Sequence, residues 1–221
     1  MPLEVIGMTV TDIFPLGHSV FHGVSWEEYS RTLQELEAVG SNAHVTFDNG
    51  EMEIMTNGDL HERAKTALGR LLETYALEAD IPITGLGQIT CRREDLLKGL
   101  DPDECYYVTT PVPPKPQGSE PLDLHAYPPP DLAIEIEVSQ SSVPKQPIYA
   151  GLGIAEVWRY DGKQLMLLHL TADGKYASVG HSNAFPALPV DRLRQFLDLA
   201  LNTSQHAAAK AIRDWVRSGK A

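Results

Sequence analysis

Apolar and polar residues alternate most regularly from Asp131 to Ser139, which predicts a β-strand because successive strand side chains point to opposite faces. One face would carry Leu132, Ile134, Ile136 and Val138, and the other Ala133, Glu135, Glu137 and Ser139. Two carboxylates therefore share one face, roughly 7 Å apart at their Cα atoms. If that face lines a pocket, the two charges repel each other, and a divalent cation would offset the cost of burying them.

Helical spacing of apolar residues predicts several helices along the chain. Ser25 and Glu28 form a capping-box pattern at the start of the first helix. Asp59 marks the start of a second, longer helix. The expected helices span residues 26–38, 60–78, 145–152, 190–201 and 205–217.

Two dipeptides, Asn49-Gly50 and Asp161-Gly162, lie between short apolar stretches and predict β-hairpins. In the strand after Asn49-Gly50, Glu51 and Glu53 would face away from Met52 and Ile54. Residues 110–130 are rich in proline and predict a long surface loop. The order of helices and strands predicts an α/β or α+β domain around a mixed sheet.

The chain has 221 residues, of which 43% are hydrophobic and 22% charged, as expected for one globular domain with its own core. We expect an N-terminal arm over residues 1–24, a domain over residues 25–204 and a C-terminal helix over residues 205–221. No apolar run approaches the roughly 20 residues that span a membrane. The N-terminus lacks the basic segment of a signal peptide. Cys91 and Cys105 form no disulfide framework, so we expect a cytoplasmic location.

The formal net charge of the chain is −12. Non-specific affinity for nucleic acid comes largely from Lys and Arg side chains that meet phosphates. The overall charge therefore argues against broad nucleic-acid binding, and a nucleic-acid substrate would require a metal ion and a local basic patch.

Asp103, Glu135 and Glu137 form the leading candidate site. Hard cations such as Mg²⁺ use oxygen ligands, typically one or two carboxylates completed by water and substrate phosphate. Such an ion can polarise a phosphoryl group and activate a water molecule. The alternative is that Glu135 and Glu137 line the solvated face of an antiparallel strand.

Three further charged residues have both a functional and an ordinary interpretation. Lys145 could stabilise a phosphate oxygen or position the attacking water, or it could be a solvated charge at a helix start. Glu53 could supply another acid, although an outward hairpin face explains it equally well. Glu62, in the first turn of the long helix, could simply complement the helix dipole.

Several strings in a fixed order resemble a large bacterial restriction-endonuclease-like family within the PD-(D/E)xK nuclease superfamily. The resemblance covers roughly residues 25 to 200. It rests on the following strings: Ser-Trp-Glu-Glu-Tyr (25–29), Asn49-Gly-Glu-Met-Glu-Ile-Met55, His61-Glu62, Asp101-Pro-Asp-Glu-Cys-Tyr-Tyr-Val108, Pro130-Asp-Leu-Ala-Ile-Glu-Ile-Glu-Val138 and Pro147-Ile-Tyr-Ala-Gly-Leu-Gly-Ile-Ala-Glu-Val-Trp-Arg-Tyr-Asp161.

The resemblance implies an α/β fold with a restriction-endonuclease-like mixed central sheet of four or five strands, flanked by helices, here with an added β-hairpin. It also implies a Mg²⁺ (or Mn²⁺) site. Pro102-Asp103 matches the superfamily's PD, and Glu135 matches its second acid. Glu62 resembles the extra acid of the first core helix. Asp103 and Glu135 would bind the metal, with the Ile136 carbonyl oxygen as a third ligand.

The chain departs from the superfamily pattern at Glu137, which stands where a lysine belongs, two residues after Glu135. Either Lys145 reaches into the site from the following helix, or the catalytic lysine is absent. In the first case Lys145 should point towards Glu135 or Glu137, and Glu137 would be an auxiliary acid.

We therefore expect a Mg²⁺-dependent endonuclease that hydrolyses phosphodiester bonds of nucleic acid, with DNA as the expected substrate. Two alternatives remain open at this stage. One is a catalytically degenerate nuclease fold that binds DNA or a protein partner, and the other is a metal-dependent hydrolase of a small phosphorylated molecule. Cutting both strands of a duplex favours a homodimer. The hairpin strands at Val157–Tyr160 and Leu165–Leu168 and the C-terminal helices are candidate interface material.

Overall fold

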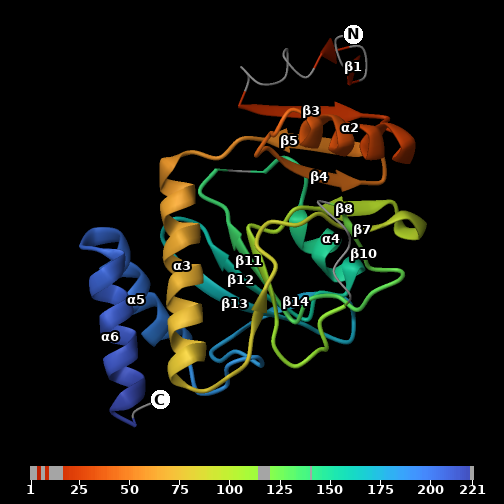
Figure 1. Ribbon diagram of the computed structural model, residues 1–221. Coiled ribbons are helices and arrows are strands. Elements are labelled where there is room, and N and C mark those ends of the chain that lie inside the picture. Colours follow the sequence, from red (N-terminus) through yellow and green to blue (C-terminus); the bar gives the residue numbers. More distant parts are fainter. Residues whose placement is uncertain (1–3, 6–7, 10–16, 114–119, 140, 220–221) are drawn as a thin grey trace.

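The computed structural model describes residues 4–5, 8–9, 17–113, 120–139 and 141–219, and contains two six-stranded sheets, a two-stranded ribbon and flanking helices (Figure 1). All five expected helices are confirmed to within one residue at each end. The helices are α2 (Trp26–Ala38), α3 (Asp59–Glu78), α4 (Lys145–Leu152), α5 (Val190–Asn202) and α6 (Gln205–Arg217), and a 3-10 turn spans Glu94–Leu96.

The strands of the two predicted hairpins and the strand after Asp131 are present, although the last is shorter than the sequence pattern. Other strands were not predicted from the sequence, among them His18–His22 and, inside the predicted loop over residues 110–130, Leu122–Asp123. All the strands are β1 (Glu4–Val5), β2 (Met8–Thr9), β3 (His18–His22), β4 (His44–Asp48), β5 (Glu51–Met55), β6 (Thr84–Gly85), β7 (Cys91–Arg93), β8 (Lys98–Leu100), β9 (Glu104–Tyr107), β10 (Leu122–Asp123), β11 (Leu132–Ile136), β12 (Glu156–Tyr160), β13 (Leu165–Leu170) and β14 (Tyr176–Val179).

The central sheet has the strand order β14-β13-β12-β11-β9-β6. It is mixed, as the resemblance implies, because β11 pairs parallel to β12 and antiparallel to β9. It has six strands in the described residues instead of four or five, because β6 and β14 extend its two edges. All five residues of β11 are buried, so the alternative of a solvated strand face at Glu135 is wrong.

Different elements cover the two faces of the central sheet. Helices α3 and α5 pack on the face that carries Leu132, Ile134 and Trp158, and α6 packs on these two helices (Figure 1). Helix α4 packs on the opposite face, against Ala133 and Val157. Because Glu135 lies two residues after Ala133, its side chain leaves β11 on the α4 side.

The second sheet has the order β10-β7-β8-β4-β5-β3. The Asn49-Gly50 hairpin is confirmed, and both residues have positive φ angles, 50° and 92°, as a type I′ turn requires. The hairpin is part of this sheet and is not an isolated addition. Thr46 pairs with both Glu53 and Leu100, so these three side chains share one face.

The opposite face of the second sheet carries Val45, Phe47 and Met52, which pack with Tyr29 and Leu36 of α2. Since Leu100 packs in the same cluster as Ile148 of α4, the Thr46 face is turned towards α4 and the central sheet. The second sheet therefore has one face towards the candidate site and one face under α2.

The N-terminal arm expected over residues 1–24 includes one strand of the second sheet. His18–His22 form β3, which pairs with β5 over five register positions. This segment lacks a long alternating pattern, and it becomes a strand because β5 offers an open edge for pairing. Most of residues 1–16 lie outside the described residues. The division into arm, domain and C-terminal helix stays a prediction, although α6 packs closely on α3 and α5.

The hairpin expected as interface material lies in the core, because Val157, Trp158, Leu165 and Leu167 are all buried. The sequence could not distinguish core packing from a subunit interface, since core and interface strands have the same apolar pattern. Among the described residues, no helix has both the length and the apolar character needed to cross a membrane.

Candidate active site

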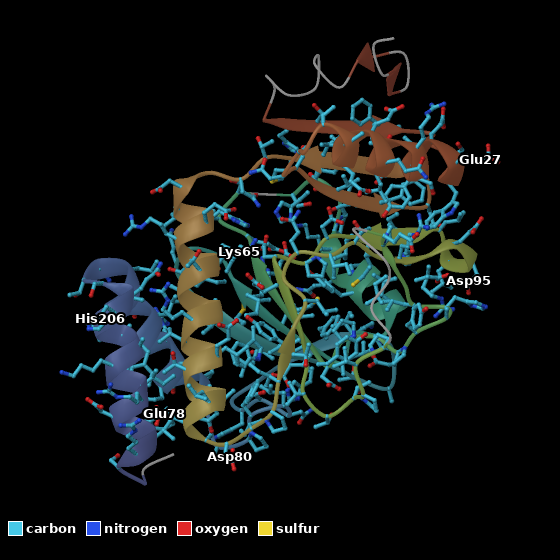
Figure 2. All side chains as sticks on the ribbon, viewed as in Figure 1. Glu27, Lys65, Glu78, Asp80, Asp95 and His206 are labelled. Carbon is cyan, nitrogen blue, oxygen red and sulfur yellow. The ribbon has the colours of Figure 1, made fainter. Side chains whose placement is uncertain are left out.

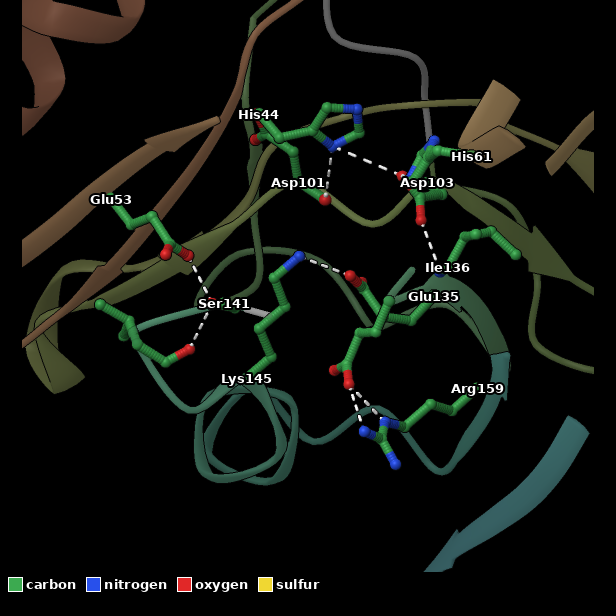
Figure 3. Close-up of polar contacts among 12 residues, drawn as sticks. His44, Glu53, His61, Asp101, Asp103, Glu135, Ile136, Ser141, Lys145 and Arg159 are labelled. Carbon is green, nitrogen blue, oxygen red and sulfur yellow. Dashed lines mark hydrogen bonds and ion pairs between the residues drawn. The ribbon is translucent and has the colours of Figure 1, made fainter. Parts of the chain in front are cut away.

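Asp103 lies immediately before β9 and beside the end of β11. Its backbone N–H donates to the Ile134 carbonyl (3.2 Å), and the Ile136 N–H donates to its Oδ2 (2.6 Å). The side chain is almost fully buried. These bonds place the Asp103 carboxylate at the residue that follows Glu135, the second acid of the pair that the resemblance implies (Figure 3).

Glu135 receives two side chains from one face of α4. Lys145 pairs with Oε1, and the Tyr149 hydroxyl donates to Oε2 (2.5 Å). Residues four apart in a helix lie on the same face, which is why both can reach one carboxylate. The predicted orientation of Lys145 towards Glu135 is confirmed (Figure 3), whereas its catalytic role stays a prediction.

Burial and the neighbouring charges oppose each other at Glu135, Lys145 and Asp103. Burial raises the pKa of Glu135 to about 7, although the charge of Lys145 opposes the shift. Burial alone would lower the pKa of Lys145, but the carboxylate of Glu135 outweighs it and the pKa of Lys145 is raised. Burial would also raise the pKa of Asp103, but the hydrogen bond from His61 and the charge of His44 outweigh it and hold that pKa below its usual value.

Two buried histidines surround Asp103, and sequence reasoning did not assign either to the site. His61 Nε2 lies 3.0 Å from Asp103 Oδ1, and His44 Nδ1 lies 3.6 Å from the same oxygen. His61 stands in the first turn of α3, and His44 is the first residue of β4. The His61-Glu62 string contained a signal for His61, while nothing local to His44 indicated that β4 would pack beside Asp103.

Glu62 lies behind His61 and does not reach the acidic pair. Its Oε1 is 3.2 Å from His61 Nδ1, and half of its side chain is exposed. Glu62 can therefore orient the imidazole that contacts Asp103. The role of an extra metal-binding acid, implied by the resemblance, stays a prediction.

Glu53 is buried on the site-facing side of β5, and the interpretation as an outward hairpin residue is wrong. It accepts hydrogen bonds from the Ser141 hydroxyl and from the Ser142 N–H (2.7 Å), and it pairs with His18 (2.7 Å). The strand alternation was predicted correctly. The error arose because a second sheet folds over this face, which no local pattern indicates. Glu53 therefore anchors the loop that leads to Lys145.

Glu137 follows the end of β11 and is paired with Arg159 of β12, whose Nε donates to Oε2 (2.5 Å). The sequence pattern extended the strand to Ser139, but in the structure β11 ends at Ile136. With its charge balanced by Arg159, Glu137 lies at the mouth of the site. Its role as an auxiliary acid stays a prediction.

The site contains little free space in this conformation. A cavity of about 10 Å³ is lined by Asp103, Ile136, Glu53 and Lys145 together with His44 and His61. A larger groove of about 800 Å³ adjoins it, and Lys145, Arg159 and Lys163 line that groove with Glu137. In this groove the three basic side chains outnumber the two acidic ones, Glu137 and Asp161, whereas the chain as a whole is acidic and carries charged side chains such as Glu27, Asp80 and Asp95 on its outside (Figure 2).

The donor chemistry fits a hard divalent cation. Asp103 and Glu135 supply carboxylate oxygens on neighbouring strands, and the raised pKa of Glu135 shows that Lys145 does not fully compensate its buried charge. Among the described residues, no group of three or more His, Cys, Asp or Glu side chains is arranged to hold a metal ion. Ligands beyond the two carboxylates would therefore come from a backbone carbonyl, water and substrate.

Replacing Tyr149 by Phe should weaken the site without unfolding the protein. The variant loses the 2.5 Å hydrogen bond to Glu135, and loss of such a supporting contact typically costs ~10–100-fold in activity or metal affinity. For the Mg²⁺-dependent cleavage that the sequence predicts, we expect the rate to fall by that factor and the half-maximal rate to require more Mg²⁺. The measurement is the initial cleavage rate over a Mg²⁺ titration.

Tyr176→Phe is a matched control, because the Tyr176 hydroxyl donates a 2.5 Å bond to the Ile154 carbonyl and does not contact the acidic pair. Equal Mg²⁺ dependence in the two variants would show that Tyr149 has only a packing role.

One family model matches most of the chain. The family model described as "Uma2: Putative restriction endonuclease" matches residues 26–202. A crystal structure described as a putative nuclease belonging to DUF820, from Anabaena variabilis ATCC 29413, is similar with a TM-score of 0.45 and 14% sequence identity, over 69% of this chain and 90% of that chain. No curated protein matches the chain.

Proposed function

This chain belongs to the Uma2 family of restriction-endonuclease-like proteins, and from that premise we propose that it is an endonuclease that hydrolyses phosphodiester bonds of DNA with Mg²⁺ or Mn²⁺. One observation carries the proposal. The buried carboxylates of Asp103 and Glu135 lie beside each other in the sheet, and Lys145, whose side chain is only 11% exposed, pairs with Glu135 although it lies outside the usual sequence position of the lysine. The family membership confirms the expected resemblance, and the proposal adds substrate, metal and residue roles to it.

Each proposed role follows from a contact. Asp103 and Glu135 would hold the metal, with the Ile136 carbonyl oxygen as a further ligand. A bound Mg²⁺ would polarise the phosphoryl oxygen and lower the pKa of the attacking water. Lys145 lies beside Glu135, so its ammonium can move a short distance to a phosphate oxygen and stabilise the charge that develops there.

Further residues would hold these groups in place. Tyr149 fixes the Glu135 carboxylate, and His61 fixes Asp103 while Glu62 orients His61. Arg159 and Lys163 in the adjoining groove can bind phosphates that flank the scissile bond. Glu137 lies between this groove and the two acids and pairs with Arg159. When a substrate phosphate binds Arg159, the Glu137 carboxylate is released and can act as an auxiliary acid.

The decisive experiment is a cleavage assay of the full chain. Plasmid and single-stranded DNA are incubated with Mg²⁺ or Mn²⁺ and, in parallel, with EDTA. We expect cleavage with either ion and none with EDTA. If no nucleic acid is cut with any divalent ion, the endonuclease proposal fails and a DNA-binding or protein-interaction module is favoured. Release of phosphate from small phosphoesters, without DNA cleavage, would favour a small-molecule hydrolase.

We also propose that the chain acts as a homodimer in the cytoplasm, since one site per chain cuts one strand at a time. The buried hairpin strands cannot form the interface, so the contact must use another surface. Light scattering at micromolar concentration should give about twice the chain mass of 24.3 kDa. A monomeric mass together with double-strand cleavage would contradict this proposal.

A further inference from the structure

Glu53 joins two segments that lie far apart in the sequence. Its carboxylate is buried on β5, and it lines the small cavity of the candidate active site together with Lys145. His18 of β3 pairs with this carboxylate. Ser141 and Ser142, in the loop before α4, also bind it, and Figure 3 shows the contact with Ser141. A strand near the N-terminus and the loop that leads to Lys145 therefore meet at one buried side chain.

The buried carboxylate of Glu53 depends on these donors, because burying a charge without hydrogen bonds is costly. Its Oε1 accepts from His18 Nε2 and from the Ser142 N–H, each at 2.7 Å. The Ser141 hydroxyl shares its one proton between Glu53 Oε2 and the Val143 carbonyl oxygen. With His18 in place, the rotamer of Glu53 is already fixed, so the loop binds it at a lower entropy cost.

Helix α4 begins without the usual side-chain cap. Its N-cap residue is Pro144, and none of the described side chains makes a capping hydrogen bond to its first turn. The fixed φ of Pro144 and the buried side chain of Val143 leave few conformations between Ser142 and Lys145. The bonds from Glu53 to the loop therefore take the place of a cap, because they set where the helix, and with it Lys145, begins.

The role proposed for Lys145 requires accurate placement. Its side chain is only 11% exposed and pairs with Glu135, one of the two acids proposed to bind the metal. Groups that act on a reacting phosphate must be held within ~0.5 Å of their productive position, and a misplacement of about 1 Å can cost ~10²-fold in rate. A loop released from Glu53 would shift the start of α4, and Lys145 with it.

We propose that His18 and Glu53 are positioning residues of the candidate active site. His18 fixes Glu53, Glu53 holds the loop, and the loop sets the place of Lys145. Neither His18 nor Glu53 touches the reacting phosphate. Their role rests on the proposed function, in which Lys145 stabilises that phosphate. Strand β3, which the sequence pattern assigned to an N-terminal arm, is then part of the active-site scaffold.

A neighbouring pair on the same two strands provides matched controls. His22 of β3 is paired in register with Glu51 of β5, and His22 Nδ1 lies 3.5 Å from Glu51 Oε1. Their side chains are 73% and 53% exposed, and neither bonds the loop before α4 in the part of the chain that the structure describes. Substitutions in this pair change the same residue types on the same strands without affecting the loop.

Steady-state cleavage kinetics of the full chain provide the first test. We expect Glu53→Gln to lower kcat ~10–100-fold, the usual cost of losing a contact that orients a site residue, and His18→Ala to lower it by a factor near the bottom of that range. KM should change little, because the groove that would bind flanking phosphates is unaltered. His18→Gln should restore most of the rate, because its amide N–H can replace Nε2 as the donor. His22→Ala and Glu51→Gln should keep the wild-type kcat.

A double variant distinguishes positioning from a general loss of stability. If His18 acts only through Glu53, adding His18→Ala to Glu53→Gln should lower kcat no further. Independent, multiplied effects of the two substitutions would overturn the proposal, as would equal losses in His18→Ala and His22→Ala. If Glu53→Gln does not fold, His18→Ala and its rescue by His18→Gln decide the question.

A spectroscopic test on the metal-free protein does not depend on cleavage. NMR spectra of protein with isotope-labelled lysine report the environment of the Lys145 side chain, whose signal is identified by its loss in Lys145→Ala. We expect His18→Ala and Glu53→Gln to shift this signal, and His22→Ala to leave it in place. An unchanged signal in the first two variants would overturn the proposal. A shifted signal in a chain that cleaves no DNA would count against the proposed nuclease and not against this arrangement.

Discussion

Replacing Asp103 by Asn is expected to reduce DNA cleavage ~10³-fold or more, because the metal that Asp103 would bind supplies several kcal/mol of transition-state stabilisation. The substitution keeps an oxygen that can accept from the Ile136 N–H, but it removes the negative charge next to His61. The measurement is the initial rate of plasmid cleavage at saturating Mg²⁺.

The same substitution should also lower the free energy of unfolding, by about 1–3 kcal/mol, because charged hydrogen bonds hold Asp103 in the fold. A simple picture of two repelling carboxylates would predict no loss of stability. The contacts from His61 and Ile136 change that expectation, since they favour the ionised form that the substitution removes.

Asp131→Asn provides a matched control for stability. Asp131 accepts hydrogen bonds from the N–H groups of Val108, Thr109 and Thr110 (2.7, 2.9 and 2.9 Å), and these contacts hold its pKa below the usual value. This variant should lose similar stability and keep its cleavage rate. If both variants lost activity in proportion to stability, the role of Asp103 would be structural.

The sequence predicted the elements that carry the site because their patterns are local. Alternation in β11 sets the direction of Glu135, and helical spacing sets the start of α4 at Lys145. Once that helix is placed, Tyr149 could also have been found, because it lies four residues after Lys145 on the same face.

The residues that the sequence missed or misjudged depend on contacts between distant segments. His44 and Glu53 enter the site only because the second sheet packs against α4 and the central sheet. The strand pattern of β5 is compatible with either a solvated or a buried acidic face, and only the packing of the second sheet decides between them.

Lys145→Ala should reduce cleavage ~10²–10³-fold, the usual cost of losing one electrostatic donor near the reacting phosphate. Lys175→Ala is a better control than Lys163→Ala, because Lys163 lines the same groove as Lys145. Initial cleavage rates of the two variants at saturating Mg²⁺ make the comparison, and Lys175→Ala should keep the wild-type rate.

Lys145→Ala should also change how stability depends on pH in the metal-free protein. Burial raises the pKa of Glu135 to about 7 even beside Lys145, and loss of the ammonium should raise it further. A carboxyl whose folded pKa is raised stabilises the fold below its unfolded pKa, and this advantage is lost as pH rises through the folded pKa. The melting-temperature deficit of the variant should therefore grow as the pH rises above about 7, where Glu135 of the wild type is ionised. A constant deficit together with unchanged cleavage would show that Lys145 does not act as the lysine of this site.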